Sequence, residues 1–517
     1  MADQTRVLII GSGVAGASVA THLLRRGIGP ILMLEAGPPV SMKDRRAWLD
    51  YVTSGALPYK KCEDIAEEVE QLGEHKWNIL GGRLFARGGT TLHWGGVSFR
   101  FKQEDFELRT RTGRGLDWPL TYADLEPYYG DAEHFLQVAG DSSVADPPRS
   151  KSYPFEAAPF GLADGPVIEA MTTLGMGYQH VPVTRNTKPI NGRPACQTVG
   201  TCKYCPVGAR YSADQTLDDL VRHAQFELRV NSPVRRILLS SKRRVAGVEY
   251  VDTVTGREGR IEADSVIVCA GALEGAKLLL GTTSPEWPHG IGNDTGHVGR
   301  YLVAHPYFSV VGTRSDNPRR LQQELHFSTL CTRRYDSPAE QAQGKGIIQK
   351  SYSRPSLNLV TNMATGSSAA AIDAAAVGRH TYDIELTVEP VSEWENRVQP
   401  AAGITRYGLP RTRIEAPKPH FNVAAVRFYG EESRKILAKM GYTPQPMQPY
   451  DQRGDHAMCT CRMARSEADG VVGPDLKVFG TDNLYVCSNA VFSSPSAVNP
   501  TLTLVALAIR FAESAAL

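Results

Sequence analysis

The sequence lacks a long apolar run, a strong excess of charge and a signal-peptide pattern. Its longest apolar run near the C-terminus, residues 502–509, is far shorter than the ~20 residues that a membrane span needs. The net charge of +2 gives no reason to expect a nucleic acid or an acidic membrane as partner. Polar residues lead directly into an apolar run at 7–10, so we expect a cytoplasmic protein.

The sequence also gives no sign of a disulfide framework. The nine cysteines are odd in number and mostly scattered, which does not fit the disulfide framework of a small secreted protein. The 517 residues are 42% hydrophobic and 22% charged, the composition of an ordinary globular protein. A chain of this length predicts two or more domains.

The most informative stretch is VLIIGSGVAG, residues 7–16. Four aliphatic residues in a row predict a buried parallel strand. Gly11, Gly13 and Gly16 then match the dinucleotide fingerprint, in which they permit a tight turn, the approach of a pyrophosphate and close helix packing, respectively. Glu35 ends the next strand about 20 residues further on, where a ribose hydroxyl would be held. A dinucleotide is therefore expected to bind here.

A second glycine-rich stretch, GGRLFARGGTTLHWGG, covers residues 81–96. Its glycines leave backbone N–H groups unhindered, which suits a loop pressed against a flat ligand through Gly89 and Thr90. His93 is either part of that site or a packed loop histidine.

Further strand patterns define two kinds of sheet. Residues from 265 read as a buried parallel strand that runs into a turn at Ala270, after strands at 234–239, 245–250 and 259–263. Alternating segments between 302 and 450, such as 307–311 and 382–388, predict an antiparallel sheet.

The C-terminal part carries two candidate polar groups. His456 lies in the segment HAMCTCRM, and Asn499-Pro500-Thr501 begins the last predicted helix. Such a start presents a polar side chain and free N–H groups at the positive end of the helix dipole, where a substrate oxygen or a flavin carbonyl could be held. A plain helix N-cap is the alternative, but it leaves the His456 segment unexplained.

These motifs together resemble the glucose–methanol–choline (GMC) oxidoreductases, an FAD-dependent family that oxidises alcohols. Four stretches match in the family's order: the GSGVAG turn with Glu35, the loop with His93, the His456 segment and the Asn499-Pro500 stretch. They span the chain from residue 7 to its end. The GGTTLHW loop is similar to the sugar-acting branch, which includes pyranose oxidases and glycoside 3-oxidases or 3-dehydrogenases.

The resemblance implies roles for individual residues. His456 matches the family's catalytic histidine, and Asn499 matches the second member of its His–Asn or His–His pair. The residues expected to contact the cofactor are Gly11, Gly13, Gly16, Glu35, Gly89, Thr90, His93, Val234, Ala270, Asn489 and Thr501. Non-covalent FAD is expected, with a covalent link at His93 as the alternative. The sequence departs from the family pattern at Cys459, where glycine is usual, and at Ser488-Asn489.

Three cysteines lie close together in the loop of Cys196, Cys202 and Cys205. Thiolates at such spacing can ligate an iron–sulfur cluster. The fourth ligand is missing, zinc would normally want four, and the spacing differs from that of the three-iron loop in some sugar dehydrogenases. We expect a metal-free loop and keep an iron–sulfur cluster as the alternative.

The predicted fold is α/β, with a Rossmann-like FAD-binding domain and a second α+β substrate domain built on an antiparallel sheet. The FAD-binding domain is expected to comprise residues 1–45, 80–100, 215–301 and 451–517, and the substrate domain 46–79, 102–214 and 302–450.

The expected activity is oxidation of a secondary hydroxyl of a sugar or glycoside, as in pyranose 2-oxidases or glycoside 3-oxidases. His456 would act as base, and electrons would pass to oxygen or another acceptor. Three alternatives remain: a glycoside 3-dehydrogenase with a cytochrome or quinone acceptor, a nicotinamide-dependent dehydrogenase and a non-catalytic flavoprotein. The sequence does not define the substrate, the carbon oxidised or the oligomeric state.

Overall fold

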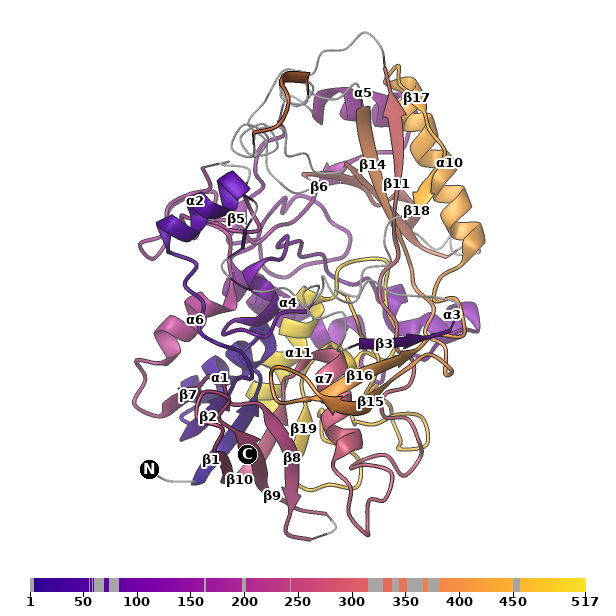
Figure 1. Ribbon diagram of the computed structural model, residues 1–517. Coiled ribbons are helices and arrows are strands. Elements are labelled where there is room, and N and C mark those ends of the chain that lie inside the picture. Colours follow the sequence, from indigo (N-terminus) through magenta and orange to yellow (C-terminus); the bar gives the residue numbers. More distant parts are fainter. Residues whose placement is uncertain are drawn as a thin grey trace.

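The structure is a computed structural model. It describes residues 4–517 except 55, 58, 60–68, 74–82, 162–163, 198–200, 242, 315–328, 337–343, 351–365, 371–380 and 450–455. Residues 81–82 of the predicted glycine-rich loop and parts of the predicted substrate domain thus lie outside the described residues. Figure 1 shows one sheet beside both chain termini and a second sheet at the opposite end of the molecule. Among the described helices, none is both long and apolar enough to cross a membrane.

The first sheet has seven strands, mostly parallel, in the order β7-β2-β1-β10-β9-β8, with β19 also paired to β10. Its strands are β1 (Gln4–Ile10), β2 (Ile31–Leu34), β7 (Phe226–Arg229), β8 (Val234–Leu239), β9 (Val245–Val251), β10 (Glu258–Val268) and β19 (Leu484–Val486). The central strands are apolar on both faces because helices cover them. The helices that contact these strands include α1 (Val14–Arg25) and α7 (Gly271–Gly281). A further layer adds α11 (Thr501–Ser514) and α6 (Ala213–Leu220), which pack on α1, and α4 (Tyr122–Leu136), which packs on α11.

Strand β10 corrects one sequence prediction. The sequence predicts separate strands at 259–263 and from 265, whereas the structure joins them in one strand without a turn. Its first half alternates in burial and pairs antiparallel with β9. Its second half is continuously buried and pairs parallel with β1 and β19. One strand therefore belongs both to the predicted meander and to the dinucleotide-type sheet.

The second sheet is antiparallel, as predicted for this region. Its order is β17-β11-β14-β13-β12-β6, with β18 also paired to β11. The strands are β6 (Gln179–His180), β11 (Tyr307–Thr313), β12 (Leu330–Thr332), β13 (Gly346–Lys350), β14 (Thr381–Val388), β17 (Thr443–Pro444) and β18 (Gln448–Pro449).

The two faces of this antiparallel sheet differ in polarity. Phe308, Ile348 and Leu386 pack with α5 (Gly165–Thr173) and α10 (Val423–Lys439) in an apolar core. Because strand side chains alternate, the neighbouring residues point to the opposite face. That face carries Tyr307, Ser309, Gln349, Glu385 and Thr387. A polar surface is thus turned away from the helices.

Smaller elements complete the chain. They are α2 (Arg45–Ser54), α3 (Leu108–Thr112), β3 (Val69–Leu72), β4 (Ala139–Gly140), β5 (Phe155–Glu156), β15 (Arg397–Ile404) and β16 (Pro410–Glu415). Strands β15 and β16 form a separate sheet with β3 and contact α7. They therefore lie beside an element of the first sheet's layer, although the sequence analysis places 302–450 in the substrate domain. The domain limits stay a prediction.

Candidate active site

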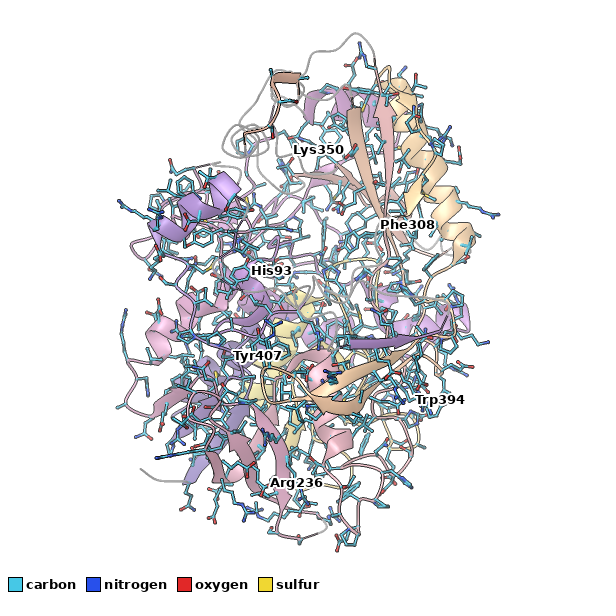
Figure 2. The ribbon with its side chains drawn as sticks, in the orientation of Figure 1. His93, Arg236, Phe308, Lys350, Trp394 and Tyr407 are labelled. Carbon is cyan, nitrogen blue, oxygen red and sulfur yellow. The ribbon has the colours of Figure 1, made fainter. Side chains whose placement is uncertain are left out.

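A cavity of 580 Å³ lies where the glycine-rich turns of the first sheet meet the polar face of the second. In Figure 2, His93 lies below Phe308 and Lys350 of the antiparallel sheet and above Arg236 of β8. Residues from both sheets and from the loop after Arg83 line the cavity. The predicted site residues Val234, Ala270 and Thr501 are among them.

Three helices begin at this cavity. The first residues of α1, α7 and α11 line it, and none of the three has a side-chain hydrogen bond at its N-cap. Uncapped helix N-termini present N–H donors and the positive end of the helix dipole, which attract anionic groups. Helix N-termini in the cavity wall thus suit a ligand with anionic or strongly polar groups, such as a dinucleotide.

The glycines of the fingerprint have different surroundings. A Cβ on Gly16 would stand 2.2 Å from the Gly11 carbonyl oxygen, and Gly16 lies behind the cavity wall. A Cβ on Gly13 would meet no atom within 4 Å, because Gly13 faces the open cavity. Gly16 thus allows the helix to pack, and Gly13 leaves room for a ligand.

Glu35 lies at the end of β2, as predicted, and lines the cavity. Its Oε2 accepts hydrogen bonds from the Ser12 N–H at 3.0 Å and the Ser12 hydroxyl at 2.6 Å. Burial raises the pKa of the Glu35 carboxyl above its usual value, although hydrogen bonds from Ser12 and Gly37 oppose the shift. In this structure the carboxylate holds the glycine turn, and its contact with a ribose stays a prediction.

The loop around Gly89, Thr90 and His93 forms another wall of the cavity. The buried Arg210 guanidinium fixes this loop by donating to the carbonyl oxygens of Thr91 and Leu92, both at 2.6 Å. Gly89 contacts the first turn, since a Cβ on Gly89 would stand 3.1 Å from Gly13 Cα. The two glycine-rich motifs predicted to share one ligand therefore lie together.

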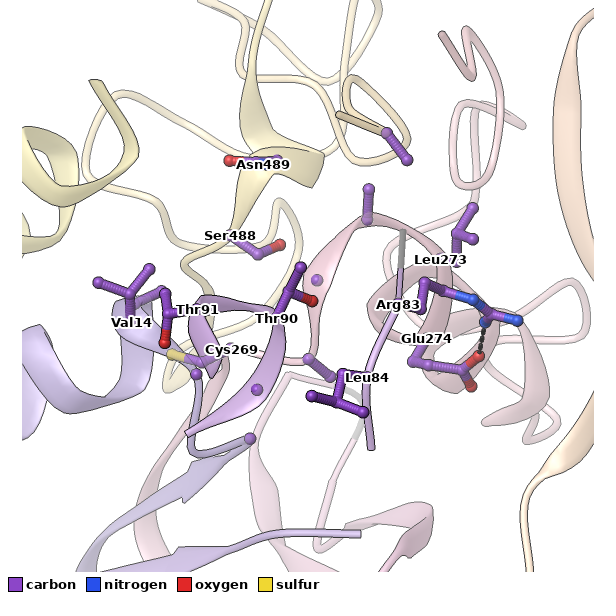
Figure 3. Close-up of a pocket in the computed structure, with 18 of the residues that line it drawn as sticks. Val14, Arg83, Leu84, Thr90, Thr91, Cys269, Leu273, Glu274, Ser488 and Asn489 are labelled. Atoms are coloured by element: carbon purple, nitrogen blue, oxygen red, sulfur yellow. Dashed lines mark hydrogen bonds and ion pairs between the residues drawn. The ribbon is translucent and has the colours of Figure 1, made fainter. Parts of the chain in front are cut away.

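A buried ion-pair network lies at another side of the cavity. Arg83 and Lys277 contact the Glu274 carboxylate at 2.5 and 2.8 Å, and Figure 3 shows the Arg83–Glu274 pair. Burial alone would raise the pKa of Glu274, but Lys277 and Arg83 outweigh it and hold the pKa below its usual value. These charges were not anticipated from the sequence.

Three residues from two other segments converge around His456. Asn499 Nδ2 lies 3.3 Å from His456 Nε2. The other ring nitrogen, His456 Nδ1, lies 3.0 Å from His305 Nδ1 and 3.1 Å from the Tyr307 hydroxyl. The predicted pair His456 and Asn499 therefore meets at the cavity, and His305 and Tyr307 are additional members that sequence reasoning missed.

The antiparallel sheet supplies polar groups opposite the glycine turns. Glu385 is 3% exposed, and its Oε1 accepts a hydrogen bond of 2.7 Å from Gln349 Nε2. Both line the cavity together with Tyr307. The polar–apolar alternation of residues 383–388 is the sequence signal that could have identified this face.

The residues present fit a bound dinucleotide. Asn489 and Arg83 line the cavity on separate segments (Figure 3). Asn489 Oδ1 and Arg83 Nε are buried and have no hydrogen-bond partner among the described residues. A buried polar atom without a partner costs free energy unless a ligand or water satisfies it. Together with the open space over Gly13, these atoms favour a polar ligand here.

The three cysteines of the predicted loop do not line the cavity, although Lys203 between them does. Cys202 is buried and Cys196 and Cys205 are half-buried, and all eight cysteines within the described residues are free. Across the described part of the chain, no group of three or more histidine, cysteine or acidic side chains is placed to hold a metal ion. Neither the structure nor the relatives reported next support the iron–sulfur alternative.

Comparison with known proteins identifies the family. The GMC oxidoreductase family models match residues 6–307 and 393–508. The chain therefore belongs to the GMC oxidoreductases, a family of FAD-dependent enzymes that act on CH–OH groups.

Individual relatives cover nearly the whole chain. The fructose dehydrogenase large subunit of Gluconobacter japonicus is 25% identical over 98% of this chain and 97% of its own length. The paromamine 6'-oxidase of Streptomyces fradiae is 27% identical over 99% of this chain and 91% of its own length. The crystal structure of pyridoxine 4-oxidase from Mesorbium loti has a TM-score of 0.65 and 19% identity, with 98% of both chains covered. This likeness shows the shared α/β fold.

Proposed function

We propose that this protein binds FAD non-covalently and oxidises a secondary hydroxyl of a sugar or glycoside to the keto sugar. The observation that carries the proposal is the His456–Asn499 pair, which lies in a cavity between helix N-termini and a polar sheet face. Two relatives are named for fructose and paromamine, which supports a sugar-type substrate.

The residues that would hold FAD line two parts of the cavity. Gly13 and the N-terminus of α1 would face its diphosphate, while Thr90, His93, Asn489 and the N-terminus of α11 beside Asn499 would contact the flavin part. When bound there, FAD would supply the hydride acceptor that oxidation of the alcohol carbon requires.

The protein's own groups manage the proton and the orientation of the substrate. A neutral His456 Nε2 would take the hydroxyl proton as the C–H bond breaks. Asn499 would hold the same hydroxyl and keep the C–H bond aligned. The Glu385 carboxylate would accept hydrogen bonds from the other hydroxyls of the sugar, and the Gln349 amide would donate to them. A simple alcohol lacks these hydroxyls.

The test is an anaerobic screen of flavin reduction with monosaccharides, O-glycosides, C-glycosides and simple alcohols, followed by analysis of which carbon is oxidised. A sugar should bleach the flavin bands. Bleaching by simple alcohols alone would contradict the substrate class, and a folded protein without flavin absorbance after incubation with FAD would contradict the proposal as a whole.

Two variants sharpen the assignment of the polar face. Glu385→Gln should weaken reduction by the active sugar. Asp383→Asn, on the same strand and outside the cavity lining, is the matched control and should react like the parent. Reoxidation by air, compared with an added cytochrome or quinone, then defines the electron acceptor.

A further inference from the structure

A row of hydrogen-bonding groups extends behind His456, away from Asn499. His305 Nε2 lies 2.6 Å from the Ser496 carbonyl oxygen, and its Nδ1 lies 3.0 Å from His456 Nδ1. His305 is 1% exposed. A backbone bridge between Val303 and Met458, with Met458 N–H donating to the Val303 carbonyl at 2.9 Å, keeps the two histidine segments in register.

The positions of the protons follow from these contacts. A carbonyl oxygen only accepts, so His305 Nε2 must carry a proton and donate it to Ser496. Burial favours the neutral form of His305, and its Nδ1 is then an acceptor. A lone pair on His456 Nδ1 would repel the lone pair on His305 Nδ1 at this distance, so His456 Nδ1 must carry a proton.

The remaining contacts agree with this assignment. With Nδ1 protonated, a neutral His456 has a bare Nε2, which accepts from the Asn499 amide N–H. The Tyr307 oxygen, 3.1 Å from His456 Nδ1, is a second acceptor for the same proton. The protons on His305 Nε2 and His456 Nδ1 then each point to an acceptor.

We propose that His305 is a positioning residue that fixes His456 in the tautomer whose unprotonated Nε2 faces the cavity. The tautomer rests on the contacts of the two histidines and on the burial of His305. Its consequence for the reaction, that a bare Nε2 is ready to take the substrate's proton, rests on the proposed function.

Two substitutions separate the two ring nitrogens of His305. His305→Asn places an amide oxygen near the original Nδ1 and keeps the acceptor for His456. His305→Gln places its amide near the original Nε2, keeps the donor to Ser496 and removes that acceptor. Both are polar, and retention of FAD and an unchanged unfolding temperature would show that they fold.

The direct measurement is nitrogen NMR of the FAD-loaded protein with ¹⁵N-labelled histidine. The chain has 13 histidines, and the signals of His456 are assigned as those lost in His456→Gln. In the parent and in His305→Asn, Nδ1 should give the protonated type of signal and Nε2 the unprotonated type. In His305→Gln the Nε2-protonated tautomer should appear.

Kinetics give a second readout. His305→Gln should slow the limiting rate of flavin reduction on the order of 10²-fold through loss of orientation, and His305→Asn should restore most of it. Without the acceptor the protonated form of His456 is less stabilised, so its pKa falls, and the rise of rate with pH should move to lower pH in His305→Gln. The titratable side chains lining the same cavity from other elements, among them His93, Lys203, Tyr307 and Glu385, are unchanged in both variants.

The outcomes separate the two proposals. Identical His456 signals in the parent and in His305→Gln would overturn the role of His305. So would a result in which Tyr307→Phe changes the tautomer of His456 and His305→Gln does not. Failure of every sugar to reduce the flavin would instead overturn the proposed function, and the tautomer would still be measured.

Discussion

Two glycines of one motif should respond in opposite ways to substitution. Gly13 is the N-cap of α1, with φ −68° and ψ −175°, a conformation open to other residues. Its missing Cβ points into open space, whereas that of Gly16 would meet the Gly11 carbonyl oxygen at 2.2 Å. We therefore expect Gly13→Val to affect the ligand and Gly16→Ala to affect the fold.

The magnitudes follow from these contacts. In the apoprotein, Gly13→Val should cost no more than ~1 kcal/mol, the loss of a favourable N-cap residue. Against a diphosphate seated on Gly13, the added methyl groups should cost ~3 kcal/mol, the upper range of overpacking, which weakens FAD binding on the order of 10²-fold. Gly16→Ala should stabilise the helix by ~1 kcal/mol through its higher helix propensity. Because the added methyl group would meet backbone, overpacking should cost ~3 kcal/mol or more, so the net effect is destabilising.

The assay is thermal unfolding of each apoprotein, followed by titration with FAD and measurement of flavin fluorescence. Gly13→Val should unfold near the parent temperature and bind FAD weakly, and Gly16→Ala should unfold at a lower temperature. FAD binding by Gly13→Val with the parent's dissociation constant would refute the placement of the diphosphate over this turn.

Three further predictions concern the site and its surroundings. His456→Ala should slow anaerobic flavin reduction by 10²–10⁴-fold, on the order expected for loss of a general base; Asn499→Ala should cost less, and a parent rate in His456→Ala would assign the base elsewhere. FAD should be released when the protein is denatured and filtered, whereas flavin retained on the chain would indicate a bond to His93. Burial raises the pKa of the Glu389 carboxyl from 4.5 to about 7. The folded protein therefore keeps its full stability below pH 4.5, where this carboxyl is protonated, and loses part of it as the pH rises through 7 and the buried group ionises. Above pH 7, Glu389→Gln should therefore unfold at a higher temperature than the parent, because its free energy of unfolding is larger by up to ~3 kcal/mol. This difference should vanish at low pH, and a difference independent of pH would contradict the assignment.

Local patterns in the sequence predicted the parts of the site that depend on short-range structure. The apolar run before Gly11 is a buried parallel strand, and the glycines after it begin a helix. The alternation in 307–311 and 382–388 is an antiparallel sheet. His456 and Asn499 were paired only through the resemblance to a family, because nothing local in either segment requires them to meet.

The residues that were missed depend on contacts between distant segments. His305 stands next to His456 only because Val303 and Met458 form a backbone bridge. Arg83 pairs with Glu274 at the cavity wall. Arg83 belongs to the glycine-rich stretch 81–96, but nothing local in that stretch indicates a partner 191 positions further along the chain. The single strand β10 was divided because its apolar period changes from alternating to continuous where its pairing changes from antiparallel to parallel.

The three helices that begin at the cavity have a consequence for the order in which the protein matures. They start at residues 14, 271 and 501, and their strands are joined through β10, which pairs with both β1 and β19. Synthesis proceeds from the N-terminus, so a nascent chain possesses the first of these helices long before the third. A chain that has not yet reached residue 501 lacks the wall that α11 supplies to the cavity. We therefore expect FAD to bind only after α11 has been made and has packed against α1.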